Sequence, residues 1–283
     1  MKFFKLLSYD IVNGIIYRYK KYLIVVLVFF VFCIDLFRTI SSYYAHSDAV
    51  KPAITMADYV FYIFKGMKEY IPAGNEPFKF PAIWIIVQLL PAYITLDYPY
   101  NDLESFGQHV LIRTGGRIFW WLSKCIWNML SVIIFYFMAY ATIILFCIFA
   151  KIPIKFEITS DPKFLSTIME VEHPLIASPG EVIVALFLLP PLISLGLCLT
   201  QMTLSLFFRP LYSFGITASI LLSSAYLVSP FLVGNYSMVM RNSIMMEGGV
   251  NTGGGIIAAS IMVVLSIFIG SIYFNRYDIL KRE

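Results

Sequence analysis

Long apolar runs dominate the chain and alternate with shorter polar segments. Six of these runs are long enough, or nearly so, to cross the membrane as helices, because about 30 Å of hydrocarbon takes about 20 helical residues. The runs cover residues 22–40, 81–96, 118–150, 182–208, 212–233 and 255–274. The second run is short and the third is overlong, so we expect the third helix to be tilted. The pattern predicts an all-α membrane protein with six transmembrane helices in a single domain, residues 1–283.

The composition supports this class. Hydrophobic residues make up 59% of the chain and charged residues 13%, and the mean hydropathy is +0.79. Soluble domains carry about 25% charged residues, whereas lipid-facing positions must be apolar. The net charge is a modest +4 and the basic residues are scattered, which speaks against a nucleic-acid partner.

The residues that usually carry chemistry are absent or badly placed. The four cysteines lie inside apolar runs, where they are expected to act as small hydrophobes rather than as disulfides or zinc ligands. The three histidines are far apart and lie outside the runs, and the sequence contains no phosphate-binding loop and no protease motif. We therefore predict no enzyme activity, no cofactor and no metal site. Any ATP hydrolysis would come from a partner subunit.

The basic residues indicate how the chain crosses the membrane. Both chain ends and the short connection at Arg209 are basic, whereas the segment 151–181 is acidic on balance. Cytoplasmic segments of membrane proteins are enriched in Lys and Arg. This favours a multi-pass protein of the cell membrane with both termini in the cytoplasm. The first run has no small-residue cleavage site after it and is expected to be retained.

Two further segments have helical patterns without the length of a span. Before the first run, Phe3, Leu7, Ile11 and Ile15 recur every four residues, which predicts an interfacial helix that enters the membrane at an elbow. The alternative is a plain extension of the first helix. The apolar stretch 56–70 predicts a helix on the outer membrane surface, with a packed part of the external loop as an equal alternative. The proline-rich segment 151–181 predicts an irregular loop.

Charges and prolines near the spans have plain interpretations. Asp35 is the one acid well inside a run, and Arg38 lies one turn away, so we expect a local pair reaching the outer interface. Arg241 is expected to be a loop charge, and the glycine-rich stretch before the last run a flexible external turn. The runs also contain prolines that can kink helices, namely Pro91, Pro190, Pro191 and Pro230.

The connection between the second and third runs predicts a short amphipathic helix. Asn101 is a good N-cap, and Asp102 and Glu104 follow in the first turn, where acids complement the positive helix end. Arg113 lies in the last turn, before two glycines that can end the helix. The apolar face consists of Leu103, Phe106 and Val110.

Basic and aromatic residues then mark the return to the membrane. Arg117, Trp120 and Trp121 are typical of the headgroup region, and Lys124 is expected to extend its ammonium to that interface.

At these residues the chain resembles the permease subunits of ABC exporters of the type-2 class. The usual pattern of that family is a Glu, a Gly, then leucines, an Arg and a Lys. Here these places are taken by Glu104, Gly107, Leu111, Arg117 and Lys124. Gln108 stands where the family commonly has Thr. The ending through Phe274, Arg276 and Asp278 resembles the aromatic and basic tail of the family's last helix.

The resemblance implies six spans, an N-terminal elbow helix and a cytoplasmic coupling helix that docks on a separate ABC-type ATPase subunit. The coupling residues would be Asp102, Leu103, Glu104, Phe106, Gly107, Val110, Arg113 and Arg117. A second permease subunit, identical or different, would complete the path. The alternative for this segment is an ordinary interfacial connector.

The alternative for the whole chain is an ATP-independent membrane protein, either a small secondary transporter or a scaffold. A secondary transporter should show inverted repeats and broken helices around polar groups at mid-membrane. The sequence shows neither an evident repeat nor many such polar residues. It does not identify a cargo.

Overall fold

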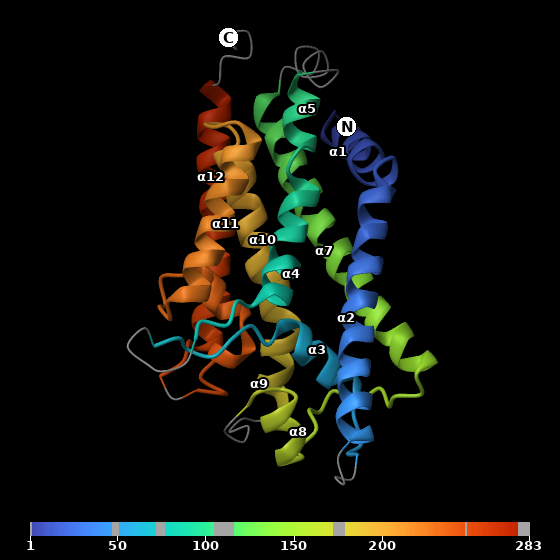
Figure 1. Cartoon of the computed structure of the whole chain (residues 1–283). Helices are drawn as coiled ribbons and strands as arrows, with labels where there is room; N and C mark the ends of the chain where they lie inside the picture. Colours follow the sequence, from blue (N-terminus) through green and yellow to red (C-terminus); the bar gives the residue numbers. More distant parts are fainter. Residues whose placement is uncertain are drawn as a thin grey trace.

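The chain folds into a bundle of long helices (Figure 1). The structure, a computed structural model, describes residues 2–46, 51–71, 77–104, 116–171, 179–246 and 248–276. Over these ranges all regular elements are helical, and the only pairing of extended backbone is an isolated bridge between Asn242 and Val250. The prediction of an all-α protein is confirmed.

The elements in chain order are α1 (Lys2–Ile11), η1 (Val12–Ile16), α2 (Tyr19–Ala45), α3 (Met56–Phe64), α4 (Ala82–Thr95), α5 (Tyr98–Glu104), α7 (Arg117–Phe149), α8 (Pro162–Thr167), α9 (Pro179–Ile183), η2 (Val184–Leu188), α10 (Leu189–Leu204), α11 (Pro210–Tyr226), η3 (Val233–Ser237), η4 (Val239–Arg241) and α12 (Thr252–Arg276). Figure 1 places α1, α5 and the end of α12 together at one end of the bundle, here called the α1 end. The opposite end, called the α3 end, carries α3, α8 and α9.

Five helical segments are long and apolar enough to cross a membrane. They are Tyr19–Ala45, Ala82–Glu104, Arg117–Phe149, Gly180–Leu204 and Thr252–Arg276. The remaining predicted run forms α11, which has 17 residues and packs against α10 and α4. The structure thus shows a multi-pass helical membrane bundle, and a sixth span stays a prediction.

Two spans differ in length from the apolar runs that predicted them. The second continues from α4 through α5, because the chain leaves the helix only for a bend at residues 96–97 and then resumes it. The 33 residues of α7 extend about 50 Å at 1.5 Å per residue, well beyond the thickness of the hydrocarbon. Figure 1 shows α7 inclined across the bundle, as its excess length predicts.

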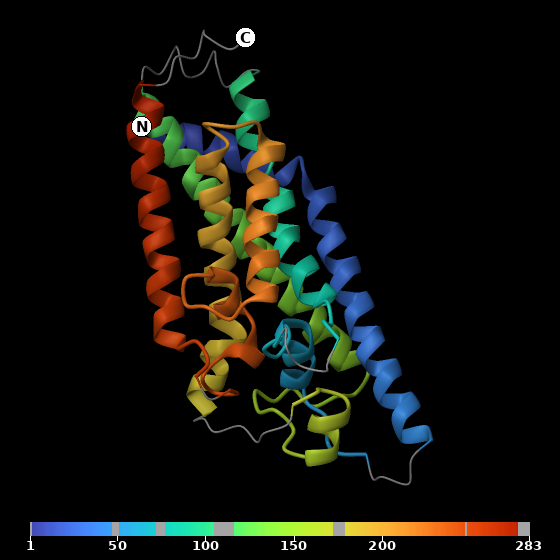
Figure 2. The same ribbon diagram turned by 60° about the vertical axis from the view of Figure 1, so that its left-hand side comes forward.

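The fifth run ends earlier than predicted. α11 stops at Tyr226, where Leu227 takes an extended conformation. Pro230 therefore lies outside any span, and the predicted kink at this residue is wrong. The segment that follows folds back, so that η3 packs against α10, α11 and α12 (Figure 2). This packing gives the segment a fixed place at the α3 end.

The segment before the first span is a separate helix, as its four-residue periodicity predicts. α1 is joined to α2 by the π-helical turn η1, and α1 packs against α7. Leu6 and Asp10 of α1 are buried. An added Cβ at Gly14 in η1 would lie 2.1 Å from the indole nitrogen of Trp127. The elbow therefore rests directly on α7.

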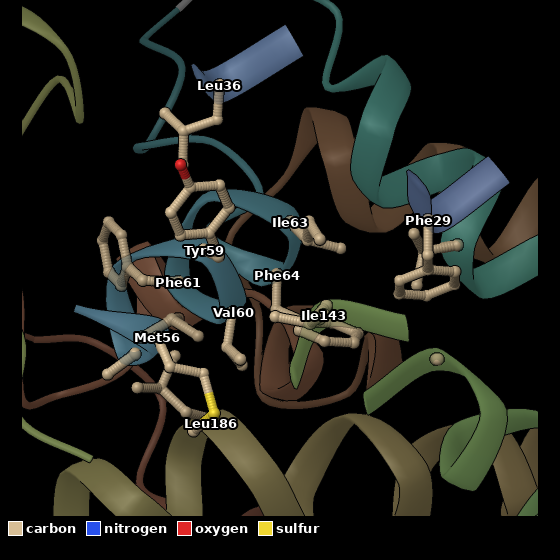
Figure 3. Packing of buried hydrophobic residues seen from close by; sticks show 14 of the residues in the cluster. Phe29, Leu36, Met56, Tyr59, Val60, Phe61, Ile63, Phe64, Ile143 and Leu186 are labelled. Carbon is tan, nitrogen blue, oxygen red and sulfur yellow. The ribbon is translucent and has the colours of Figure 1, made fainter. Parts of the chain in front are cut away.

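α3 is an internal helix rather than a surface helix. Eight of its nine residues are buried, because its apolar side chains surround the whole helix and cannot face a single surface. Figure 3 shows Tyr59 beside Leu36, Phe64 beside Ile143, and Met56 beside Leu186. Of the two expectations for this stretch, the packed loop is the one that the structure shows.

Candidate functional site

A buried lysine lies between two buried aspartates at the α1 end. The Lys124 ammonium on α7 forms ion pairs with Asp10 on α1 and with Asp102 on α5, the latter at 2.6 Å. The three side chains are 0%, 3% and 5% exposed, respectively. Charges removed from water are costly unless they are paired, so each group depends on the others. We call Asp10, Asp102 and Lys124 the charge cluster.

Hydroxyl groups add donors to the two carboxylates. Tyr98 donates a hydrogen bond to Asp10 at 2.8 Å, and Ser123 also donates to Asp10. Tyr9 donates to Asp102 at 3.4 Å. Burial, followed by the nearby Asp102 carboxylate, raises the pKa of Tyr9, which keeps its hydroxyl a neutral donor. The cluster is therefore well supplied with donors although water scarcely reaches it.

Aromatic rings and a second set of charges surround the cluster. The Lys124 Nζ lies 4.4 Å from the ring centroid of Tyr98 and 4.9 Å from that of Trp120, within the range of cation–π attraction. Arg18, just before α2, also lies over the Tyr98 ring, with its guanidinium carbon 5.1 Å from the ring centroid. Lys21 of α2 pairs with Asp97 at 3.2 Å. Four segments, α1, α2, α5 and α7, are thus joined at this end.

The predicted coupling residues fall into two groups. Asp102 and Leu103 are described and buried, with Asp102 in the charge cluster and Leu103 in an apolar cluster with Trp121. Glu104 is exposed at the end of α5. Arg117 donates to the carbonyl oxygen of Asn275 at 2.9 Å, which links the start of α7 to α12. The other predicted coupling residues lie outside the described residues, namely Phe106, Gly107, Val110 and Arg113.

The start of this segment also differs from the prediction. Asn101 is not an N-cap, because α5 begins at Tyr98 and continues the second span. Lys124 does not extend to the interface, since its side chain is fully buried against the two aspartates. Sequence reasoning missed the cluster because Asp10 and Lys124 are 114 residues apart. The available signal was a lysine within an otherwise apolar run.

A second set of polar side chains lines the contact between α4, α7 and α10. Ser194 donates to Gln88 at 2.6 Å and lies 2.6 Å from the Tyr136 hydroxyl. Gln201 donates to the Ala92 carbonyl oxygen at 2.8 Å. We call this set the polar seam; it consists of Gln88, Asn128, Ser131, Tyr136, Ser194 and Gln201.

The polar seam continues the charge cluster into the bundle. Lys124, Asn128 and Ser131 follow one another at spacings of four and three along α7 and so share one face of that helix. Tyr136 lies 12 residues beyond Lys124, about 18 Å along a helix at 1.5 Å per residue. The interior of the bundle therefore holds a row of polar side chains that the apolar pattern of the sequence did not indicate.

Several atoms of the polar seam are buried without a protein partner. Within the described part of the chain these are Gln88 Nε2, Asn128 Oδ1, Ser131 Oγ and Gln201 Oε1. A buried polar group that makes no hydrogen bond costs about 1–3 kcal/mol, and such groups in proteins usually bind internal water or a ligand. The seam is therefore chemically suited to bind small polar groups.

Two adjacent prolines at the start of α10 interrupt the span Gly180–Leu204 beside the seam. Pro190 and Pro191 have no backbone N–H, so the carbonyl groups of Leu186 and Phe187, one turn earlier, lose their helical partners. Tyr140 on α7 donates to both carbonyl oxygens, at 3.4 Å and 3.2 Å. The preceding turn, η2, is π-helical. The predicted interruption of this span is present, and a tyrosine from a neighbouring helix compensates for it.

At the α3 end the buried charges bind backbone and side-chain groups. Arg241 is fully buried and donates to carbonyl oxygens at the end of α11, including that of Ala225 at 2.7 Å. Burial lowers its pKa to about 10, so the guanidinium stays charged at neutral pH. Arg241 is thus a charge in the loop between α11 and α12, as expected, and a buried one. Asp35 differs from expectation: its carboxylate accepts a hydrogen bond from Tyr62 at 2.6 Å, and within the described residues no ion pair joins it to Arg38.

Asp58 forms a capping box with Thr55 at the start of α3. Its carboxylate accepts hydrogen bonds from the backbone N–H groups of Thr55 and Thr159, at 2.8 Å and 2.9 Å, and from both threonine hydroxyls. Burial raises its pKa, although these hydrogen bonds oppose the shift. Asp58 thus ties α3 to the loop before α8.

No group of three His, Cys, Asp or Glu side chains that could hold a metal ion occurs in the described ranges. The four cysteines are buried and free, as predicted. The sequence matches no family model, and comparisons with curated proteins and with solved structures find no match.

Proposed function

We propose that this chain is the membrane-spanning permease subunit of an ATP-driven exporter of the ABC type-2 class, with ATP hydrolysis in a separate subunit. The observation that carries the proposal is the charge cluster, which fixes α5 to α1 and α7 through buried ion pairs. The segment 105–115 follows α5 in the sequence and contains Gly107 and Leu111 of the resemblance. A partner that binds this segment would therefore act on α5, which the ion pairs hold against α1 and α7.

The charge cluster can transmit such a movement. Removing one partner of a buried ion pair costs about 3–5 kcal/mol. A force on α5 would therefore move α1 and α7 together with α5 rather than break the ion pairs between them. Packed elements of this kind move as units. α7 contacts α2, α10 and α12. It carries both Lys124 of the charge cluster and part of the polar seam. Movement at the α1 end would thus reach the interior of the bundle.

The coupling residues divide between anchoring and docking. Asp102 and Leu103 are buried and anchor the base of the segment. Glu104 is exposed, and together with Phe106, Gly107, Val110 and Arg113 it would contact the ATPase. Arg117 links the far end of the segment to α12 through the carbonyl oxygen of Asn275.

The proposed topology has six spans with both termini in the cytoplasm of the cell. The 17 residues of α11 would extend about 26 Å, close to the lower limit for a span. With α11 counted, α1 and the end of α12 lie on one side, which agrees with their common place in Figure 1. The basic residues Lys20, Lys21, Arg209 and Arg276 would then all lie on the cytoplasmic side.

The assembly would contain two permease subunits, identical or merely similar, above two ABC-type ATPase subunits. Affinity purification of the tagged chain in mild detergent, followed by mass spectrometry, tests this composition. We expect an ATPase with a phosphate-binding loop to copurify. Recovery of the chain without such an ATPase, from cells that express the neighbouring genes, would overturn the proposal.

Charge reversal tests the docking surface. Glu104→Lys and Arg113→Glu should each reduce recovery of the ATPase, because both change charges on the segment assigned to docking. Lys155→Glu is the matched control, since Lys155 is exposed at the α3 end and should leave recovery unchanged. Equal ATPase recovery with all three variants would remove the coupling role from this segment.

The polar seam favours a second candidate, an ATP-independent transporter or scaffold. Secondary transporters place polar groups near mid-membrane, and the buried amides of Gln88, Asn128 and Gln201 meet that description. Transport by the purified chain alone in liposomes, driven by an ion gradient, would support this candidate. Transport that requires both the copurified ATPase and ATP would exclude it.

A further inference from the structure

A cavity of about 290 Å³ opens at the α3 end, between α3 and the start of α4. Charged side chains and apolar rings both line it, among them Lys65, Lys79, Glu170, Phe80 and Trp84. We call it the lysine pocket. Neither the charge cluster nor the polar seam contributes a residue to it.

Two lysines share one carboxylate at the rim of the pocket. Glu170 lies 3.4 Å from the Lys65 Nζ and 3.1 Å from the Lys79 Nζ. Lys65 is mostly buried, with 14% of its side chain exposed, and also donates to the Met169 carbonyl oxygen at 3.3 Å. Lys79 is 67% exposed. The three groups leave one net positive charge facing the cavity.

The backbone at Glu170 is strained. Its φ is +61°, in the left-handed region that residues other than glycine seldom adopt. Such conformations cost about 1–3 kcal/mol and gather at functional sites. Here the strained residue is the one that holds its carboxylate between Lys65 and Lys79. The arrangement of charges is therefore maintained against a backbone penalty.

The other wall of the pocket is apolar and fixed. The Trp84 side chain is 1% exposed, and its indole N–H donates to the Ser237 carbonyl oxygen at 3.2 Å. This bond holds the ring in place where it lines the cavity. Phe80 is 55% exposed and lies four residues before Trp84, just ahead of the span that begins at Ala82. A ligand would thus meet a positive rim and an aromatic wall together.

We propose that the lysine pocket binds an amphipathic anion, with a phosphate or carboxylate group at Lys65 and Lys79 and an apolar chain against Trp84 and Phe80. The anion would take over one or both lysines from Glu170. The ligand could be the headgroup of a membrane lipid or a free amphiphile, since both present this chemistry. The inference holds for either candidate function, because it needs neither an ATPase nor a transport step.

Quenching of tryptophan fluorescence tests the binding directly. The purified chain in an uncharged detergent is titrated with bromododecanoate, whose bromine quenches nearby indoles. We expect saturable quenching that is lost in Trp84→Phe, because the other tryptophans lie on α7 at residues 120, 121 and 127, toward the α1 end. A brominated chain with a quaternary ammonium group is the control ligand. Equal quenching by this cation would overturn the proposal.

Substitutions of the three charged residues give the sharper test. Lys65→Gln and Lys79→Gln should each weaken binding about tenfold, the effect of losing one charge-assisted hydrogen bond. Glu170→Gln should strengthen binding, because it removes the competitor for both lysines. Lys163→Gln is the matched control, since Lys163 is an exposed lysine at the same end.

A purely structural ion-pair network predicts a different pattern. In that case Glu170→Gln would not tighten binding, and the lysine variants would change thermal stability without changing the quenching. Lys79 is largely exposed, so Lys79→Gln should leave the fold intact and keep the test decisive. Unchanged affinity in both lysine variants would overturn the proposal.

Lipid nanodiscs distinguish the two sources of the anion. The chain is reconstituted in phosphatidylcholine with or without phosphatidylglycerol, and the retained lipid is read by native mass spectrometry. Retention of phosphatidylglycerol that is lost in the double lysine variant identifies a lipid headgroup. Quenching by the free amphiphile without lipid retention identifies a soluble ligand. Failure of both arms would overturn the inference and leave the proposed transport function untouched.

Discussion

Within the described part of the chain, each buried charge has several partners from different parts of the sequence. Lys124 binds two aspartates, Asp58 accepts from two threonines, and Arg241 donates to the backbone of the segment after α3 and of the end of α11. A single partner does not offset the cost of taking a charge out of water, whereas several hydrogen bonds to the same group can. These residues are therefore expected to be sensitive to substitution although none of them is apolar.

Lys124→Met should destabilise the chain strongly. The substitution leaves Asp10 and Asp102 buried without a cation, which costs about 3–5 kcal/mol. The triple variant Lys124→Met, Asp10→Asn, Asp102→Asn should recover much of this loss, because it removes the unpaired charges together with the lysine. Thermal unfolding in detergent measures both. A single variant as stable as the parent would show that the cluster carries no charge pairing.

The lysine pocket should lose affinity for an anion as the pH rises. Burial lowers the pKa of Lys65 from its ordinary value of 10.5, although Glu170 opposes the shift. The ammonium is the form that binds the anion, so binding is strongest below this lowered pKa and falls as the pH rises through it. Titration with bromododecyl sulfonate, which stays ionised, measures the profile.

Lys65→Arg gives the control for this pH dependence, because arginine keeps its charge over the accessible range. The plateau of binding should then extend to higher pH than in the parent chain. The same alkaline midpoint in parent and variant would show that Lys65 does not titrate in the binding reaction.

At this scale the sequence predicts residue types better than residue partners. Asp10 stands out as an acid in an amphipathic segment, and Lys124 as a cation among apolar residues, but nothing local relates the two. Their pairing depends on how α1 packs across α7, which is a tertiary contact. Arg241 illustrates the same limit. It donates to carbonyl groups at the end of α11, and the apolar pattern placed that helix end at residue 233 rather than at Tyr226.

Helix boundaries depend on such contacts as well. The predicted fifth run extended to residue 233 because its residues stay apolar, yet α11 ends at Tyr226, where Arg241 binds the last carbonyl groups. α5 likewise joins the second span although Asn101 is a favourable N-cap. The lengths of the longest runs were predictable because crossing hydrocarbon demands apolar residues. Where a run exceeds that demand, packing decides its end.

The broken start of α10 should depend on one hydroxyl. Tyr140→Phe removes the donor to the Leu186 and Phe187 carbonyl oxygens, which the two prolines leave without helical partners. We expect a loss of about 1–3 kcal/mol, the cost of unsatisfied buried polar groups. Thermal unfolding measures this loss.

Tyr212→Phe is the control for this effect, because Tyr212 is 64% exposed. The two variants remove the same atom from residues of the same type. If both change stability equally, Tyr140 has no special role at the interruption of the helix.

On the scale of the whole molecule, polar chemistry follows a line along the bundle. The charge cluster lies at the α1 end, the polar seam continues from it between α4, α7 and α10, and the lysine pocket opens at the α3 end. α7 connects the first two, since it carries Lys124, Asn128 and Tyr136. A tilt of this long helix would change both together. This is the movement that a partner at the α1 end would have to produce.

The proposed topology makes the two ends of the bundle face opposite sides of the membrane, and this can be tested with introduced cysteines. All four natural cysteines are buried, so a membrane-impermeant maleimide should label the parent chain poorly. Ser160→Cys and Phe231→Cys, both at exposed positions toward the α3 end, should be labelled on intact cells. Lys20→Cys and Arg209→Cys, also exposed, should be labelled only after the membrane is opened.

The pair at positions 209 and 231 decides whether α11 crosses the membrane. These residues flank α11, so opposite accessibility means that its 17 residues span the bilayer, and equal accessibility means that they do not. Six spans bring both termini to one side, whereas five spans separate them. Because the proposed ATPase must reach residues 105–115 from the cytoplasm, labelling of Lys20→Cys on intact cells would place the charge cluster outside. An exporter subunit driven from the α1 end would then be excluded, while the helical bundle and its lysine pocket would remain.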